Sequence, residues 1–307
     1  MKLFSCVAIL LASTVIPQAA KAQFEGMKYR IPLDANTVVL INAEKMFGSE
    51  VADKDRWAER RQAAYDAGIL ALPPDATEVV MAGRLDHEFG ESVWELSMVK
   101  LNADRNVTTV AARFGGTVDE IVGRSAARLP NDQFVVQLMG NLLATYTPAN
   151  RQDVSRWLRS TDVGSKEYLQ PYLEQAFGYA EKVGTPIVMA ADLSGTISPA
   201  MVKERFDSFE SLKDSGISAD DVAKLMEGVQ GITLGVTLTD NAYGAVRVDF
   251  KDSPELLSKV GKELLIEVLQ RQGAMIDDFL EWEPSVTGNT FMLRGLVSDN
   301  GARRMLS

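Results

Sequence analysis

The sequence predicts an α+β protein of two similar halves, each a mainly antiparallel sheet that helices cover on one face. Both halves show the same succession of signals: a strand, a helix, a hairpin, a second helix and further strands. The two leading strand signals begin about 150 residues apart. This succession is the β-α-β-β-α-β order of a split βαβ unit with added strands, and it indicates an ancestral duplication.

The first half, residues 23–165, opens its regular structure with a β-branched apolar run at 37–43, which predicts a buried strand. Glycines and prolines then separate helix-like from strand-like segments. The expected elements are a polar helix at 53–67, hairpin arms at 78–85 and 93–101, a helix at 104–114 closed by Gly115, strand signals at 119–128, 134–139 and 142–146, and a helix opened by Thr147-Pro148.

The second half, residues 166–307, repeats the order after an amphipathic helix that Gly184 closes. Its expected elements are a strand at 186–193, helices opened by Ser198-Pro199 and Ser218, hairpin arms at 231–239 and 243–250, a helix at 254–272 and a strand pair at 280–286 and 290–296. Each hairpin carries apolar residues on one face, so each should pack under the helices of its own half. A groove between the halves is then expected.

The first 22 residues resemble a secretory signal peptide. A positive start, an apolar run from Leu3 to Ile16 and the small-x-small sequence Ala20-Lys21-Ala22 predict cleavage before Gln23. The chain's one cysteine, Cys6, lies inside this leader, so the mature chain has neither a thiol nor a disulfide. We therefore expect an exported protein, periplasmic or extracellular.

Composition limits the partners of the mature chain. Removing the leader leaves 285 residues with 30 basic and 42 acidic side chains, a net charge of −12. Nucleic acids and anionic lipids bind through clustered Lys and Arg, so this balance disfavours both. No later apolar run has the length of a membrane span, so no membrane insertion is expected after the signal is removed.

The layout, with the IPLDANTVVLINAEK opening and the TPANRQDVSRWL segment, resembles uncharacterised exported bacterial proteins of planctomycete-type genomes. The resemblance covers most of the mature chain. It supports the fold and the export, and it implies no activity because no catalytic motif carries it.

Little catalytic chemistry is available in the mature chain. His87 is its one histidine and it has no cysteine, which excludes Cys–His catalysis and multi-histidine metal centres. The same hairpin tip holds Asp86, Glu88 and Glu91, which could bind a divalent cation. The alternative is a solvated polar tip, and we favour it because the alternating Asp spacing of a calcium loop is missing.

Arg151, Arg156 and Trp157 form a basic, aromatic stretch that could bind an anion or a partner. The alternative, which the sequence favours, is that Trp157 packs in the core while the arginines pair with surplus acids. A second acidic group, Asp277, Asp278, Glu281 and Glu283, reads as a charged entry to a strand. Gly228, Gly231 and Gly235 follow a helix and enter a strand, the reverse of the order that a phosphate-binding loop requires.

The sequence is best interpreted as that of an exported soluble binding or structural module without catalysis, cofactor or metal. Its expected partner is an unknown protein or small molecule. The alternative is a hydrolase that uses Asp and Glu alone, for example a glycosidase-like enzyme. Burial separates the two, because a catalytic carboxyl should lie in an apolar cleft that raises its pKa.

Overall fold

The computed structural model describes residues 23–86, 90–162, 169–206, 208–213, 215–298 and 300–302. Within these residues the chain forms an α+β fold around one 12-stranded sheet, and every neighbouring pair of strands is antiparallel. The leader lies outside the described residues.

Twelve strands build the sheet: β1 (Thr37–Asn42), β2 (Ala76–Asp86), β3 (Glu91–Leu101), β4 (Thr117–Ile121), β5 (Arg124–Leu129), β6 (Gln133–Met139), β7 (Leu142–Thr147), β8 (Ile187–Asp192), β9 (Val229–Leu238), β10 (Ala242–Phe250), β11 (Glu283–Thr287) and β12 (Thr290–Val297). Their order across the sheet is β11-β12-β10-β9-β8-β1-β2-β3-β7-β6-β5-β4.

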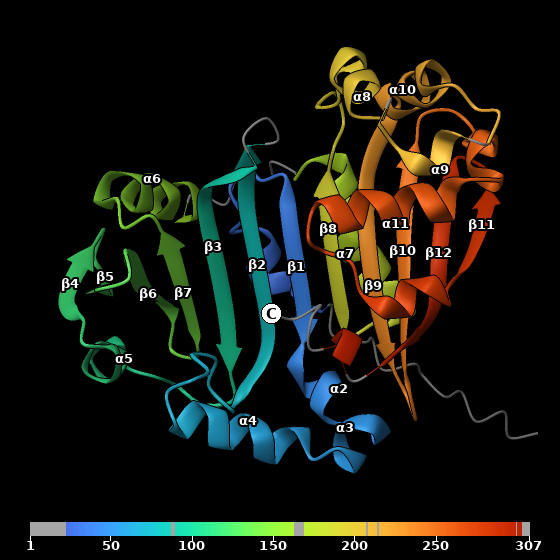
Figure 1. Cartoon of the computed structure of the whole chain (residues 1–307). Helices are drawn as coiled ribbons and strands as arrows, with labels where there is room; N and C mark the ends of the chain where they lie inside the picture. The colour runs from blue at the N-terminus through green and yellow to red at the C-terminus, as the bar shows by residue number, and fades with distance from the viewer. Residues whose placement is uncertain are drawn as a thin grey trace, which may run out of the picture.

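Helices lie on both faces and along the lower edge (Figure 1). They are α1 (Glu25–Lys28), α2 (Ala43–Phe47), α3 (Glu50–Lys54), α4 (Trp57–Asp66), α5 (Val107–Phe114), α6 (Arg151–Asp162), α7 (Pro171–Val183), α8 (Pro199–Phe206), α9 (Glu210–Lys213), α10 (Ala219–Glu227) and α11 (Gly261–Arg271), with 3-10 turns η1 (Glu255–Ser258) and η2 (Asp277–Leu280).

The two halves share one sheet, whereas the sequence predicts a sheet in each half. The leading strands β1 and β8 pair antiparallel at the centre, with Leu40 opposite Val188. The halves therefore meet edge to edge through backbone hydrogen bonds, and the expected boundary near residue 165 does not separate two sheets.

The strand order is the same on both sides of this central pair. Moving outward, the first half runs β1-β2-β3-β7-β6 and the second runs β8-β9-β10-β12-β11, while β5 and β4 extend the first half. The leading strands begin 150 residues apart, at Thr37 and Ile187. Each hairpin lies next to its leading strand, so the two hairpins occupy equivalent places on either side of the central pair.

The two main cores lie on opposite faces of the sheet. Val188 and Ala190 of β8 belong to the first core, under α6 and α7. Their partners on β9 are Gly235 and Thr233, whereas the alternate β9 residue Leu234 packs against the second core, with α10 and α11. Because opposed residues of an antiparallel pair share a face, the covered face changes between β8 and β9. Figure 1 shows α11 in front of the sheet and α7 behind it.

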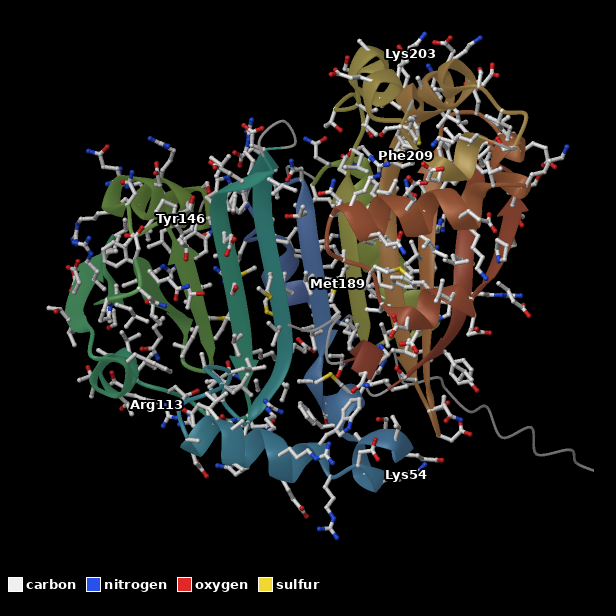
Figure 2. The ribbon with its side chains drawn as sticks, viewed as in Figure 1. Lys54, Arg113, Tyr146, Met189, Lys203 and Phe209 are labelled. Atoms are coloured by element: carbon white, nitrogen blue, oxygen red, sulfur yellow. The ribbon has the colours of Figure 1, made fainter. Side chains whose placement is uncertain are left out.

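Met189 marks the junction between these cores. Figure 2 shows it near the middle of the sheet, with Tyr146 of the first core on one side and Phe209 of the second on the other. Met189 packs against a smaller cluster that includes Met46 and Ile187. Helix α2 thereby covers the face of the central strands that α7 leaves open.

Two predicted helices are broken. The segment 53–67 divides into α3 and α4 at Arg56, whose φ is 54°. The segment 254–272 divides into η1 and α11 between Ser258 and Gly261, and a Cβ at Gly261 would overlap the Phe291 ring. Among the described residues, no helix combines the length and the apolar character needed to cross a membrane.

Candidate functional site

A groove lies on the face of the second half that the second core leaves uncovered. We call it the α7 groove: one wall is α7, and its floor is the outward face of β9, β10 and β12. Its inner part has a volume of about 60 Å³ and its outer part about 350 Å³. Tyr179, Gly235 and Ala245 line both parts, so the two are continuous.

Two glycines of β9 create the space for two tyrosines of α7. A Cβ at Gly231 would overlap the Tyr172 ring and lie 2.5 Å from the Ala191 carbonyl oxygen. A Cβ at Gly235 would lie 3.1 Å from Cε1 of Tyr179. Any larger residue at Gly231 would displace α7. Gly231 and Gly235 therefore serve the close approach of α7 to the sheet, and they do not form a phosphate-binding loop.

Asp249 is the centre of a polar network in the inner part. The Tyr172 hydroxyl donates to its Oδ2 at 3.0 Å. Its Oδ1 accepts from Arg247 Nε at 2.8 Å and from the Thr290 hydroxyl at 2.6 Å. Thr233 Oγ1 lies 3.1 Å from the Tyr172 oxygen, and it can donate there because the Tyr172 proton is used on Asp249. This carboxylate therefore has its charge and its acceptor positions satisfied.

Tyr172 remains a neutral hydrogen-bond donor. Desolvation by burial raises its pKa, the hydrogen bond from Thr233 lowers it, and the negative charge of Asp249 raises it further. The net shift is upward, so the hydroxyl holds its proton at physiological pH. A buried phenol with a raised pKa is suited to hold α7 against the sheet and unsuited to act as a nucleophile.

The outer part of the groove carries polar side chains that have no hydrogen-bond or ion-pair partner among the described residues. It is lined by Tyr179, Tyr243, Glu281, Glu283 and Arg294. Arg294 and Glu283 are cross-strand neighbours on β12 and β11, yet no ion pair within 4.0 Å joins them. Tyr243 is 44% exposed. A cation, two carboxylates and two aromatic rings therefore face the same opening.

Trp282 fixes the position of the two glutamates that flank it. Its ring is 1% exposed and occupies the space beside Gly244 and Gly295, where a Cβ would overlap it. Its Nε1 donates to the Leu296 carbonyl at 2.7 Å. Packing and a hydrogen bond hold the indole in place. The backbone at Glu281 and Glu283 therefore has a fixed position at the rim of the α7 groove.

The basic, aromatic stretch lies elsewhere, on α6 in the first half. Trp157 is in the main core and donates to the Arg30 carbonyl at 2.7 Å. Arg156 pairs with Asp153 at 3.1 Å, and Arg151 pairs with Asp119. Arg151 also donates to the Glu120 carbonyl of the edge strand β4 at 2.5 Å. This contact uses a backbone acceptor that an edge strand would otherwise present to other chains.

The acidic hairpin tip is described in part. Asp86 and Glu91 are opposed residues at the end of the β2–β3 hairpin, and Glu88 and His87 lie outside the described residues. Over the part of the chain that the structure covers, no group of three or more His, Cys, Asp or Glu side chains is placed to hold a metal ion.

Of the second acidic group, Asp278 has a structural role. Its Oδ2 accepts from the backbone N–H of Ser298 at 3.1 Å and from the Ser298 hydroxyl at 3.0 Å. Glu281 and Glu283 line the α7 groove. The sequence predicted a groove between the halves, whereas the α7 groove lies within residues 166–307. The signal that could have found it is the pair Tyr172 and Tyr179 set against Gly231 and Gly235.

Comparison with known proteins supports the fold alone. No protein-family model and no curated protein matches the chain. Crystal form I of TP0453 resembles it with a TM-score of 0.51 and 10% sequence identity, over 91% of this chain and 94% of that one. Crystal forms III and IV of TP0453 give TM-scores of 0.49 and 0.47 at 9% and 8% identity.

Proposed function

We propose that the mature chain is an exported, non-catalytic binding module and that its ligand occupies the α7 groove. The observation that carries the proposal is the contrast between the two parts of the groove. The inner network around Asp249 is complete, whereas the side chains of Arg294, Tyr243, Glu281 and Glu283 in the outer part lack a hydrogen-bond or ion-pair partner among the described residues. A preorganised wall beside unpaired polar groups is typical of a binding site.

The groove chemistry describes the ligand that would fit. Arg294 would bind a carboxylate or another planar anion through two parallel N–H donors. Glu281 and Glu283 would accept from hydroxyl or amine donors on the same ligand. The exposed Tyr243 ring would cover an apolar face of it. We therefore expect a ligand that carries both an anionic group and hydrogen-bond donors.

A hydrolase that uses carboxylates is the weaker proposal. Glu281 and Glu283 are exposed, so neither has the dry surroundings of a general acid. Asp249 is occupied by donors from three residues. At Glu267, desolvation would raise the pKa, but hydrogen bonds from Ser211, Arg271 and the Glu210 amide outweigh it and lower the pKa. That direction is opposite to the one a general acid needs.

We also propose that the two halves arose by duplication. The support is the matching order of five strands outward from β1 and from β8, and the spacing of 150 residues between the starts of these two strands. After such a duplication, the second half would have lost apolar residues on the face that α6 and α7 cover in the first half. The α7 groove would then be a former core face that has become polar.

The test compares three proteins recovered from the exported fraction of the natural host. These are the wild type, the groove variant Arg294→Ala and the matched control Arg60→Ala, which removes an exposed arginine from α4. Each is captured after gentle cross-linking, and bound molecules are identified by mass spectrometry. We expect a ligand on the wild type and the control that is at least tenfold depleted on Arg294→Ala. Equal recovery from all three would contradict the assignment to the groove.

A further inference from the structure

The residue at which the mature chain is expected to begin lies beside the main core. Gln23 directly precedes Phe24 and α1, and both Phe24 and Met27 are 1% exposed. The Phe24 ring meets the Phe177 ring of α7 edge-on, with 6.4 Å between the ring centroids. The predicted first residue therefore directly precedes a residue packed in the core, whereas most chains have a loose end at this point.

The Gln23 side chain is buried and incompletely satisfied. The residue is 9% exposed, and its Nε2 has no hydrogen-bond partner in the part of the chain that the structure describes. A buried amide group without a partner opposes folding because it has given up its hydrogen bonds to water. Cleavage of the leader would add an α-ammonium group to this same poorly hydrated residue.

We propose that Gln23 cyclises to pyroglutamate once the leader is removed, an inference that rests on the export proposed above. The α-ammonium group first loses a proton to solvent, and the resulting amine attacks Cδ of its own side chain. A new bond forms between the α-nitrogen and Cδ, a second proton passes from the α-nitrogen to Nε2, the bond from Cδ to Nε2 breaks, and Nε2 leaves as ammonia. The carbonyl carbon keeps its oxidation level, so neither an oxidant nor a cofactor is required.

The product suits the place that Gln23 occupies. Cyclisation removes the unpartnered Nε2 and replaces a charged α-ammonium with a neutral lactam N–H, so two costs of burial disappear together. The ring also blocks the free α-amine that aminopeptidases recognise. The modification would therefore protect Phe24, which precedes α1, and Met27 of α1, both of which belong to the main core.

The test is the intact mass of the full precursor expressed in an exporting bacterial host and recovered from the exported fraction directly into acid. We expect residues 23–307, lighter than their sequence mass by one ammonia, about 17 Da. Their first peptide should resist Edman degradation. The variant Gln23→Ala is the matched control, because it keeps the cleavage signal and cannot cyclise. A synthetic, uncyclised peptide of residues 23–34, added at lysis, reports any cyclisation during handling.

The outcomes separate this inference from the export on which it rests. A chain that begins at Gln23 and retains its ammonia overturns the cyclisation and leaves export standing. A chain that keeps its leader, or is cut elsewhere, contradicts the predicted cleavage and removes the basis of the inference. Cyclisation of the added peptide to the same extent as the protein identifies a handling artefact and also overturns it.

Discussion

Two tyrosines on α7 and two glycines on β9 set how the helix meets the sheet. Tyr172 and Tyr179 are two helical turns apart, about 10.5 Å along the axis. Gly231 and Gly235 are four strand residues apart, about 13 Å. The two spacings agree closely enough for each ring to lie over its own glycine, as the contacts at both positions show. Tyr172 and Tyr179 form the wall of the α7 groove, and their contacts with the two glycines also determine how close α7 lies to the sheet.

The first prediction concerns this close approach. We expect Gly231→Ala to destabilise the protein by about 1–3 kcal/mol, because the added methyl group overlaps the Tyr172 ring and the Ala191 carbonyl. The matched control is Gly178→Ala in α7, where a Cβ meets no atom within 4 Å. That change should be neutral or stabilising by up to about 1 kcal/mol, since alanine favours helix. Urea unfolding of both variants gives the comparison, and equal stabilities would contradict it.

Alkaline pH provides the second prediction. Burial raises the pKa of Tyr146 to about 12, with smaller contributions from Asp153 and Asp34, and it raises the pKa of Tyr172 in the same direction. The unfolded chain releases these protons near pH 10. Their contribution is therefore fully present below pH 10 and is lost as pH rises through 12.

The measurement for this prediction is the free energy of unfolding between pH 8 and 12. The double variant Tyr146→Phe, Tyr172→Phe should lose less stability over this range than the wild type, because it has two fewer buried phenols to ionise. At pH 8 the variant should be the less stable protein, since Tyr172→Phe leaves Asp249 without one donor. Parallel pH profiles would show that these phenols do not govern the alkaline loss.

At the scale of elements, the cap residues differ from those that the sequence suggests. Thr147-Pro148 was expected to open a helix, but α6 begins at Arg151 and Asn150 caps it, accepting from the Gln152 amide at 2.9 Å. Ser218 caps α10 as predicted, accepting from the Asp221 amide. The difference arises because several residues near a helix start can cap it, and only the path of the chain selects one.

The third prediction concerns α11, the main helix of the second core. We expect Leu264→Asp to unfold at least the second half, because an unpaired charge in a core costs several kcal/mol against a total stability of roughly 5–15. Leu264 is buried in that core. The matched control is Leu280→Asp, because Leu280 is 52% exposed and its substitution should change stability by about 0.5 kcal/mol or less. Circular dichroism and thermal melting distinguish the two variants.

At the scale of the whole molecule, the shared sheet predicts that the halves unfold together. The variant Trp282→Phe retains only tryptophans of the first half. Its fluorescence therefore monitors that half, while circular dichroism monitors the whole chain. Adding Leu264→Ala, a cavity that costs about 2–5 kcal/mol, should lower the urea midpoint equally by both signals. Two separate transitions would mean that the β1–β8 pairing does not couple the halves.

The sequence predicted the α+β class, both hairpins and the order of the leading elements, because alternation and turn residues are local signals. It did not predict the joining of β1 to β8 or the change of covered face, since both depend on contacts between residues far apart in the chain. In the sequence, Thr233, Arg247 and Asp249 alternate with apolar residues, as the solvent side of any hairpin does. Their meeting with Tyr172 appears only when α7 is placed over them.

The change of the covered face between β8 and β9 has a consequence for amide hydrogen exchange. At the centre, α7 lies on one face of β1 and β8 while α2 lies near the other. Their backbone hydrogen bonds are therefore farthest from water, and their exchange should require opening of the whole molecule. Protection should decline outward in both directions, toward β4 at one end and β11 at the other. Exchange monitored by mass spectrometry should thus show a slow centre with two faster margins.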